Sequence, residues 1–66
     1  MFTKTIIESI RKALNGNPNT QEIKALDGVL IVRETNETLL KKYRDDNWVQ
    51  HGTVAYFNQH FAVFIS

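Results

Sequence analysis

The last thirteen residues, VAYFNQHFAVFIS, constrain the fold of this chain more than any other stretch. They contain no Asp, Glu, Lys or Arg, and before Ser66 only Asn58, Gln59 and His60 interrupt the aliphatic and aromatic residues. β-branched and aromatic side chains favour strands, and a short polar break between two such runs favours a turn. The stretch therefore predicts an antiparallel hairpin with Asn58-Gln59 as its turn, in which Tyr56 lies opposite Phe61.

Both faces of this hairpin are apolar. One face is predicted to carry Val54, Tyr56, Phe61, Val63 and Ile65, and the other to carry Thr53, Ala55, Phe57, His60, Ala62 and Phe64. An antiparallel sheet usually packs one face on a core and turns the other to water. If helices shield one face only, Phe57 and Phe64 require curling of the sheet or a partner to cover them. The C-terminal strand FAVFIS is also predicted to be an unprotected edge.

A second hairpin is predicted in QEIKALDGVLIVRE around Asp27-Gly28. Asp-Gly suits a two-residue type I′ turn, because both turn positions then take positive φ. That turn places Leu26 opposite Val29, Ala25 opposite Leu30, Ile23 opposite Val32 and Glu22 opposite Arg33. The alternative is a second helix over residues 20–26, which are rich in helix formers.

Two further segments have helical spacing. Phe2, Ile6, Ile7, Ile10, Ala13 and Leu14 recur at the intervals of an amphipathic helix, which Asn15-Gly16 would end in a left-handed conformation. In TNETLLKKYRDDN, Leu39, Leu40 and Tyr43 share one side, and Thr35 or Asn36 is the expected N-cap. We therefore predict one α+β domain over residues 1–66 in the order α-β-β-α-β-β, with an antiparallel sheet of about four strands and both helices on one face.

The composition excludes several classes of protein. The chain has 66 residues, no cysteine and a formal net charge of +1. Disulfides and thiolate metal sites are therefore excluded, and a cytoplasmic location is expected. No uncharged apolar run approaches the roughly 18 residues that a membrane span needs. The near-neutral charge lacks the strong positive field typical of a nucleic-acid-binding protein.

The residues that carry chemistry do not form a recognisable constellation. His51 and His60 lie nine positions apart, without the short spacing of metal ligands. The serines are Ser9 and Ser66, and the three glycines do not form a phosphate-binding loop. Adjacent carboxylates at Asp45-Asp46 are typical of a solvated helix end. No catalytic residue, metal or cofactor is expected, and the chain is predicted not to be an enzyme.

With enzyme activity not expected, binding to another molecule is the predicted kind of function. We expect a small accessory or inhibitor-type protein of phage, plasmid or bacterial type that occupies a surface of a partner protein and forms a homodimer. The expected interface residues are Trp48, Tyr56, Phe57, Phe61 and Phe64, although Trp48 is the largest core candidate as well. The alternative is a small nucleic-acid-binding regulator that uses Lys41, Lys42 and Arg44 with the nearby aromatic residues.

Overall fold

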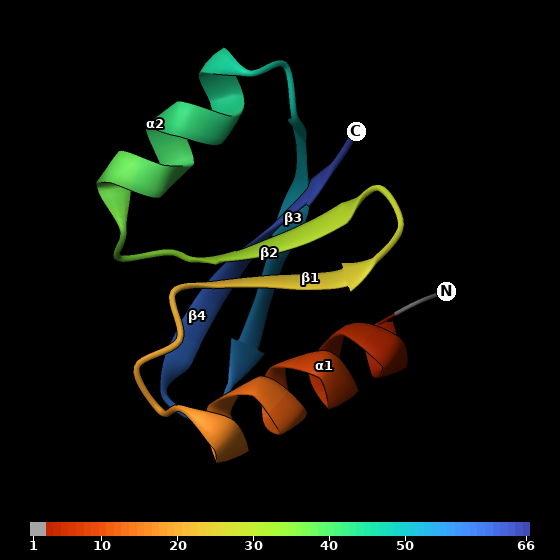
Figure 1. The fold of residues 1–66 in the computed structure, drawn as a ribbon, viewed down its shortest axis with the longest axis vertical. Coiled ribbons are helices and arrows are strands. Elements are labelled where there is room, and N and C mark those ends of the chain that lie inside the picture. The colour runs from red at the N-terminus through yellow and green to blue at the C-terminus, as the bar shows by residue number, and fades with distance from the viewer. Residues whose placement is uncertain (1–2) are drawn as a thin grey trace.

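The computed structural model describes residues 3–66, so the predicted packing of Phe2 lies outside the described residues. The elements are α1 (Thr3–Gly16), β1 (Glu22–Leu26), β2 (Val29–Arg33), α2 (Glu37–Asp45), β3 (Val49–Tyr56) and β4 (Gln59–Ile65). The four strands form one antiparallel sheet in the order β1-β2-β4-β3 (Figure 1). The predicted α+β class and the order of elements are confirmed. No helix within residues 3–66 has the length and apolarity needed to cross a membrane.

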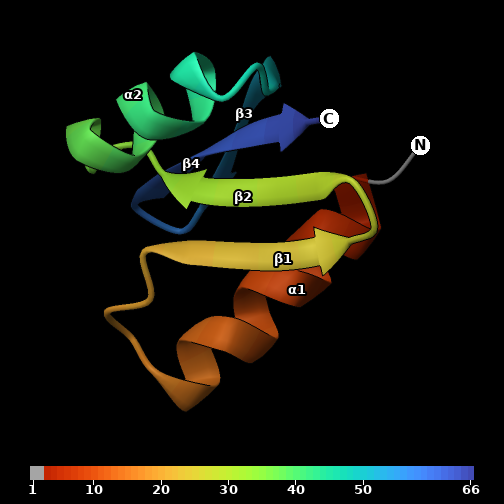
Figure 2. The ribbon, with the colours of Figure 1, turned by 45° about the horizontal axis from the view of Figure 1, so that its top comes forward.

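The two helices lie on opposite faces of the sheet, as the two ribbon views show (Figure 1, Figure 2). The α1 residues Ile6 and Ile10 pack with Ile31 and Phe61, whereas Leu40 of α2 packs in a separate cluster. The prediction that both helices share one face is therefore wrong. Because the central strands β2 and β4 are apolar on both faces, each face needs its own helix.

The α1 core contains Ile6, Ile10, Ile23, Val29, Ile31, Phe61 and Val63, all buried. The α2 core contains Leu30, Val32, Leu40, Ala62 and Phe64, with Leu39, Tyr43 and Trp48 packed against it. Alternate residues of β2 and β4 thus enter different cores, as the two-residue period of a strand requires. Phe61 and Phe64 are both fully buried, one in each core.

The helix ends follow local chemistry. Asn36 is the N-cap of α2, and its Oδ1 accepts a hydrogen bond from the amide of Leu39 at 3.1 Å, which confirms the second of the two predicted caps. The predicted left-handed end of α1 is absent, because neither Asn15 nor Gly16 has a positive φ. Instead α1 continues through Gly16, and the amide of Asn17 still donates to the Ala13 carbonyl at 2.9 Å.

The β1–β2 hairpin has the predicted turn but a different register. Residues 20–26 are not helical, and Leu26 lies opposite Val29 as predicted. The register then shifts between Lys24 and Leu26, so Ile23 faces Ile31 and not Val32. Gly28 has φ 78° but Asp27 has no positive φ, so the turn is not type I′. The irregularity moves Ile23 into the α1 core.

The β3–β4 hairpin turns one residue earlier than predicted. Tyr56 pairs with Gln59 and Val54 pairs with Phe61, so Phe57 and Asn58 form the turn. The predicted pairing of Tyr56 with Phe61 is wrong by two positions, and a shift of two leaves the residues that remain in strands on their predicted faces. The strand β4 is not an edge, since β2 and β3 flank it.

Candidate functional site

The sheet has two edge strands, β1 and β3, and the uncharged one is β3, with the sequence VQHGTVAY. It is the last strand in the sheet order, so its outer backbone has no strand partner among residues 3–66. Natural edge strands are usually protected by charged residues or proline, and β3 has neither. Its one protective feature is an irregular register between Gln50 and Thr53, where Gly52 has φ 114°.

The α2 helix leaves the second half of β3 uncovered. The cross-strand partners of β3 include Ala62 and His60, which pair with Thr53 and Ala55. Ala62 is buried in the α2 core, but Thr53, Ala55 and His60 are exposed. The opposite side of β3 is better covered, because Val54 and Tyr56 pack against the α1 core. One edge and one face of β3 are thus open to solvent.

Phe57 lies at the tip of the β3–β4 hairpin and is the most exposed large apolar residue within residues 3–66. Its relative exposure is 85%, and its φ is 56°. A positive φ in a bulky residue other than glycine is an outlier, because Cβ approaches the backbone too closely. The ring contacts Tyr56 edge-on, with 4.8 Å between ring centroids and an interplanar angle of 87°. The tip therefore presents an aromatic ring to solvent.

Arg33 holds the base of this turn. Its guanidinium donates to the side-chain oxygen of Gln59, the first residue of β4, and to the carbonyl oxygens of Thr20 at 3.0 Å and Pro18 at 3.1 Å. The same guanidinium carbon lies 5.2 Å from the ring centroid of Phe61. The turn is therefore tied to β2 and to the linker after α1, which favours a fixed position for Phe57.

The five predicted interface residues do not form one surface. Phe61 and Phe64 have no exposed surface and lie in different cores, so the fold removes both from any contact surface of the intact domain. Trp48 and Tyr56 are partly buried. Only Phe57 of the five is freely exposed, and Tyr56 is its neighbour. Trp48 packs against the α2 core, with its ring 6.0 Å from that of Tyr43 at 81°.

The α2 basic run, defined as Lys41, Lys42 and Arg44, is exposed. The Nζ of Lys42 lies 5.3 Å from the ring centroid of Tyr43, and Arg44 donates to the side-chain oxygen of Gln50 at 3.0 Å. Two of the three cations thus have contacts within the protein, and Asp45 follows them at the helix end. Nucleic-acid binding by this run stays a prediction.

Tyr43 connects α2 to the β1 edge. Its hydroxyl donates a hydrogen bond to Oε2 of Glu22. This bond, with desolvation and the charge of the same carboxylate, raises the pKa of Tyr43 to about 12 from the usual 10.0. The two histidines are exposed, and within residues 3–66 no three His, Asp or Glu side chains are grouped as metal ligands would be.

The sequence does not indicate that β3 is an edge strand, because its apolar C-terminal run predicts β4 in that position. One signal was present: Gly52 lies inside an otherwise strand-like segment, and a glycine there often marks a bulge. Comparison of this chain with models of known protein families, with curated proteins and with solved structures finds no match.

Proposed function

We propose that this chain is a non-enzymatic protein-binding module that acts by occupying a surface of a partner protein. The observation that carries the proposal is Phe57, a bulky residue with φ 56° and 85% exposure at the tip of a hairpin. Aromatic side chains dominate the binding energy of many interfaces when they insert into a pocket on the partner. The partner expected is a protein with an apolar pocket that accepts this ring.

The stability of the domain gives no reason for a phenylalanine at this position. A left-handed conformation costs a residue other than glycine roughly 1–2 kcal/mol, and an exposed ring forgoes the roughly 1.5–3 kcal/mol that burial contributes. A chain of 66 residues has a total stability of only about 3–10 kcal/mol, at roughly 0.05–0.15 kcal/mol per residue. Backbone outliers of this kind tend to occur at functional sites.

The β3 edge supports the same proposal. An exposed, uncharged edge accepts an additional strand through backbone hydrogen bonds, a common mode of protein recognition. Phe57 directly follows β3, so a strand paired along β3 brings the partner close to the ring. Two copies can pair in the same way, which supports the homodimer expected from the sequence. The absence of cysteine favours the cytoplasm as the location of the protein.

The test compares wild type with Phe57→Asn as baits in an extract of the cells that make the protein. Asparagine tolerates the left-handed conformation, so the variant keeps the turn and relieves the strain. We expect Phe57→Asn to unfold at the same or a higher urea concentration than wild type and to lose the captured partner.

Two further baits serve as controls. Phe57→Tyr keeps an aromatic ring and is expected to retain the partner, and Lys12→Gln changes an exposed residue of α1 and is expected to behave as wild type. If Phe57→Asn captures the same proteins in the same amounts as Lys12→Gln, Phe57 is not the anchor and the proposal fails.

A further inference from the structure

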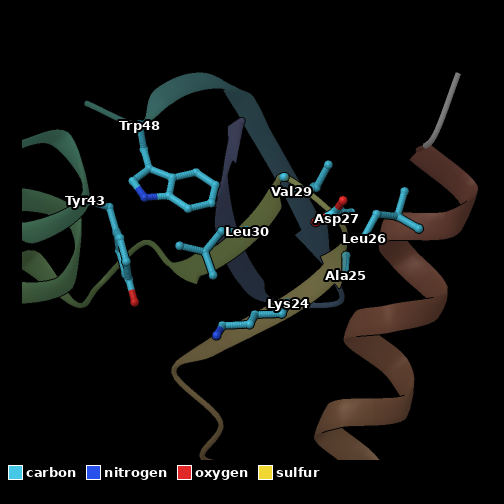
Figure 3. Close-up of a pocket in the computed structure, with 9 residues that line it drawn as sticks. Lys24, Ala25, Leu26, Asp27, Val29, Leu30, Tyr43 and Trp48 are labelled. Atoms are coloured by element: carbon cyan, nitrogen blue, oxygen red, sulfur yellow. The ribbon is translucent and has the colours of Figure 1, made fainter. Parts of the chain in front are cut away.

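A hollow of about 680 Å³ lies away from the β3–β4 tip, between the β1–β2 hairpin and the junction of α2 with β3 (Figure 3). We call it the Trp48 hollow, and its lining includes Lys24, Asp27, Leu30, Tyr43 and Trp48. Its volume falls within the roughly 300–1,000 Å³ of typical small-molecule sites. None of its lining residues belongs to the surface assigned above to a protein partner.

One wall of the Trp48 hollow is aromatic and its floor is apolar. Tyr43 and Trp48 form an edge-to-face pair on one side, with 6.0 Å between ring centroids, and Leu30 of β2 lies between them and the turn of the hairpin (Figure 3). Leu30 is 2% exposed, whereas Trp48 is only partly buried, so part of the indole surface remains uncovered. A flat ring that enters the hollow therefore meets an aromatic surface against which it can pack.

The polar group best placed to fix the orientation of a ligand is the Lys24 ammonium. Figure 3 shows the Lys24 side chain extending along the hollow toward Tyr43, while Asp27 lies at the other side, on the hairpin turn. Glu22, two residues before Lys24, accepts the hydrogen bond of Tyr43. Within residues 3–66 the structure contains one salt bridge, between Arg11 and Glu8, so the Lys24 ammonium has no ion-pair partner there.

We propose that the Trp48 hollow binds a small aromatic carboxylate, with the ring against Trp48 over Leu30 and the carboxylate paired with Lys24. An aromatic cation whose ring packs on Trp48 is disfavoured, because its charge would lie on the Lys24 side of the hollow and away from Asp27 at the hairpin turn. A neutral ring is expected to bind more weakly as well, because it gains no charge-assisted contact with the exposed Lys24 ammonium. In an aromatic carboxylate the ring packs on the aromatic wall while the carboxylate pairs with the Lys24 ammonium.

The test uses the indole Nε1–H resonance of Trp48, since the chain contains one tryptophan. The probes are phenylacetate and phenethylamine, which share a ring and differ in charge. We expect phenylacetate to shift this resonance saturably, together with the backbone amides of residues 24–30, and phenethylamine to bind roughly three- to tenfold more weakly or not at all.

Three variants decide the role of charge. Lys24→Gln is expected to weaken phenylacetate roughly three- to tenfold, whereas the exposed Lys12→Gln leaves the affinity unchanged and Asp27→Asn leaves it unchanged or raises it. The urea midpoint of each variant shows that it is folded. The proposal is overturned if phenylacetate does not bind, if phenethylamine binds as tightly, or if Lys24→Gln equals wild type. Phe57→Asn must bind phenylacetate normally, so failure here is separate from failure of the protein-binding proposal.

Discussion

Replacing Phe64 by leucine tests the two-sided arrangement of the sheet most directly. Phe64 is fully buried in the α2 core, and its ring centroid lies 6.4 Å from that of Tyr43. Truncating a buried phenylalanine to alanine costs about 3–5 kcal/mol, which approaches the roughly 3–10 kcal/mol expected for a whole chain of this length. Leucine retains most of the apolar side chain, so Phe64→Leu is expected to cost about 1–2 kcal/mol and to leave a folded protein.

The assay is urea unfolding followed by Trp48 fluorescence, because Trp48 packs against the same core. With a slope of about 1 kcal/mol per molar urea, the midpoint of Phe64→Leu falls by roughly 1–2 M. Phe57→Leu is the matched control, and it should leave the midpoint nearly unchanged because Phe57 is 85% exposed. Equal midpoints for Phe64→Leu and wild type, or an equal loss in Phe57→Leu, would refute the assignment of Phe64 to a core.

Three further predictions concern Tyr43, two glycines and the α2 basic run. Because the pKa of Tyr43 is raised in the folded state, the stability that its hydroxyl contributes is complete below pH 10, the usual tyrosine value, and is lost as the pH rises toward about 12. The urea midpoint of wild type should therefore fall across this pH window, and that of Tyr43→Phe should fall much less. Gly28→Ala should lower the free energy of unfolding by about 1–2 kcal/mol, because Gly28 has φ 78°. Gly16→Ala has nothing within 4 Å of its added Cβ and should raise that free energy by up to about 1 kcal/mol. A lower melting temperature for Gly16→Ala than for Gly28→Ala would contradict the assigned backbone. Replacing the α2 basic run by glutamine should reduce both the affinity for nucleic acid and its dependence on salt if that alternative is correct; salt-independent binding would remove it.

The elements of this fold were predictable because their signals are local. Asp27-Gly28 indicates a turn whatever surrounds it, and Asn36 can accept the amide of Leu39 as soon as one helical turn forms. Each such signal needs only a few neighbouring residues. The choice between strand and helix for residues 20–26 followed from the turn that comes after them.

The arrangement of the elements was not predictable in the same way. Both faces of β2 are apolar, so alternation alone does not show which face Ile23 joins. The irregular register between Lys24 and Leu26 decides it, and it exists because Ile23 then packs with Ile31 against α1. Because both faces of the central strands are apolar, the sequence also does not show which helix packs on which face of the sheet.

The candidate site was predictable only in part. Phe57 was among the expected interface residues because of its side chain, but the left-handed backbone that distinguishes it depends on where the turn falls. A turn at Asn58-Gln59 would have placed two polar residues at the tip. The adopted pairing of Val54 with Phe61 instead moves Phe57 into the turn.

The location of the binding surface follows from the way in which this small sheet buries its apolar residues. A helix on each face covers the central strands β2 and β4, so Phe61 and Phe64 stabilise the domain and are not accessible to a partner. The surfaces that the two cores leave open to partners are the β3 edge with its hairpin tip and the Trp48 hollow, which Tyr43 of α2 lines on one side. Because the two surfaces share no residue, a substitution at Phe57 should weaken only the protein partner and one at Lys24 only the aromatic carboxylate. The double variant should therefore lose each affinity by the same factor as the corresponding single variant.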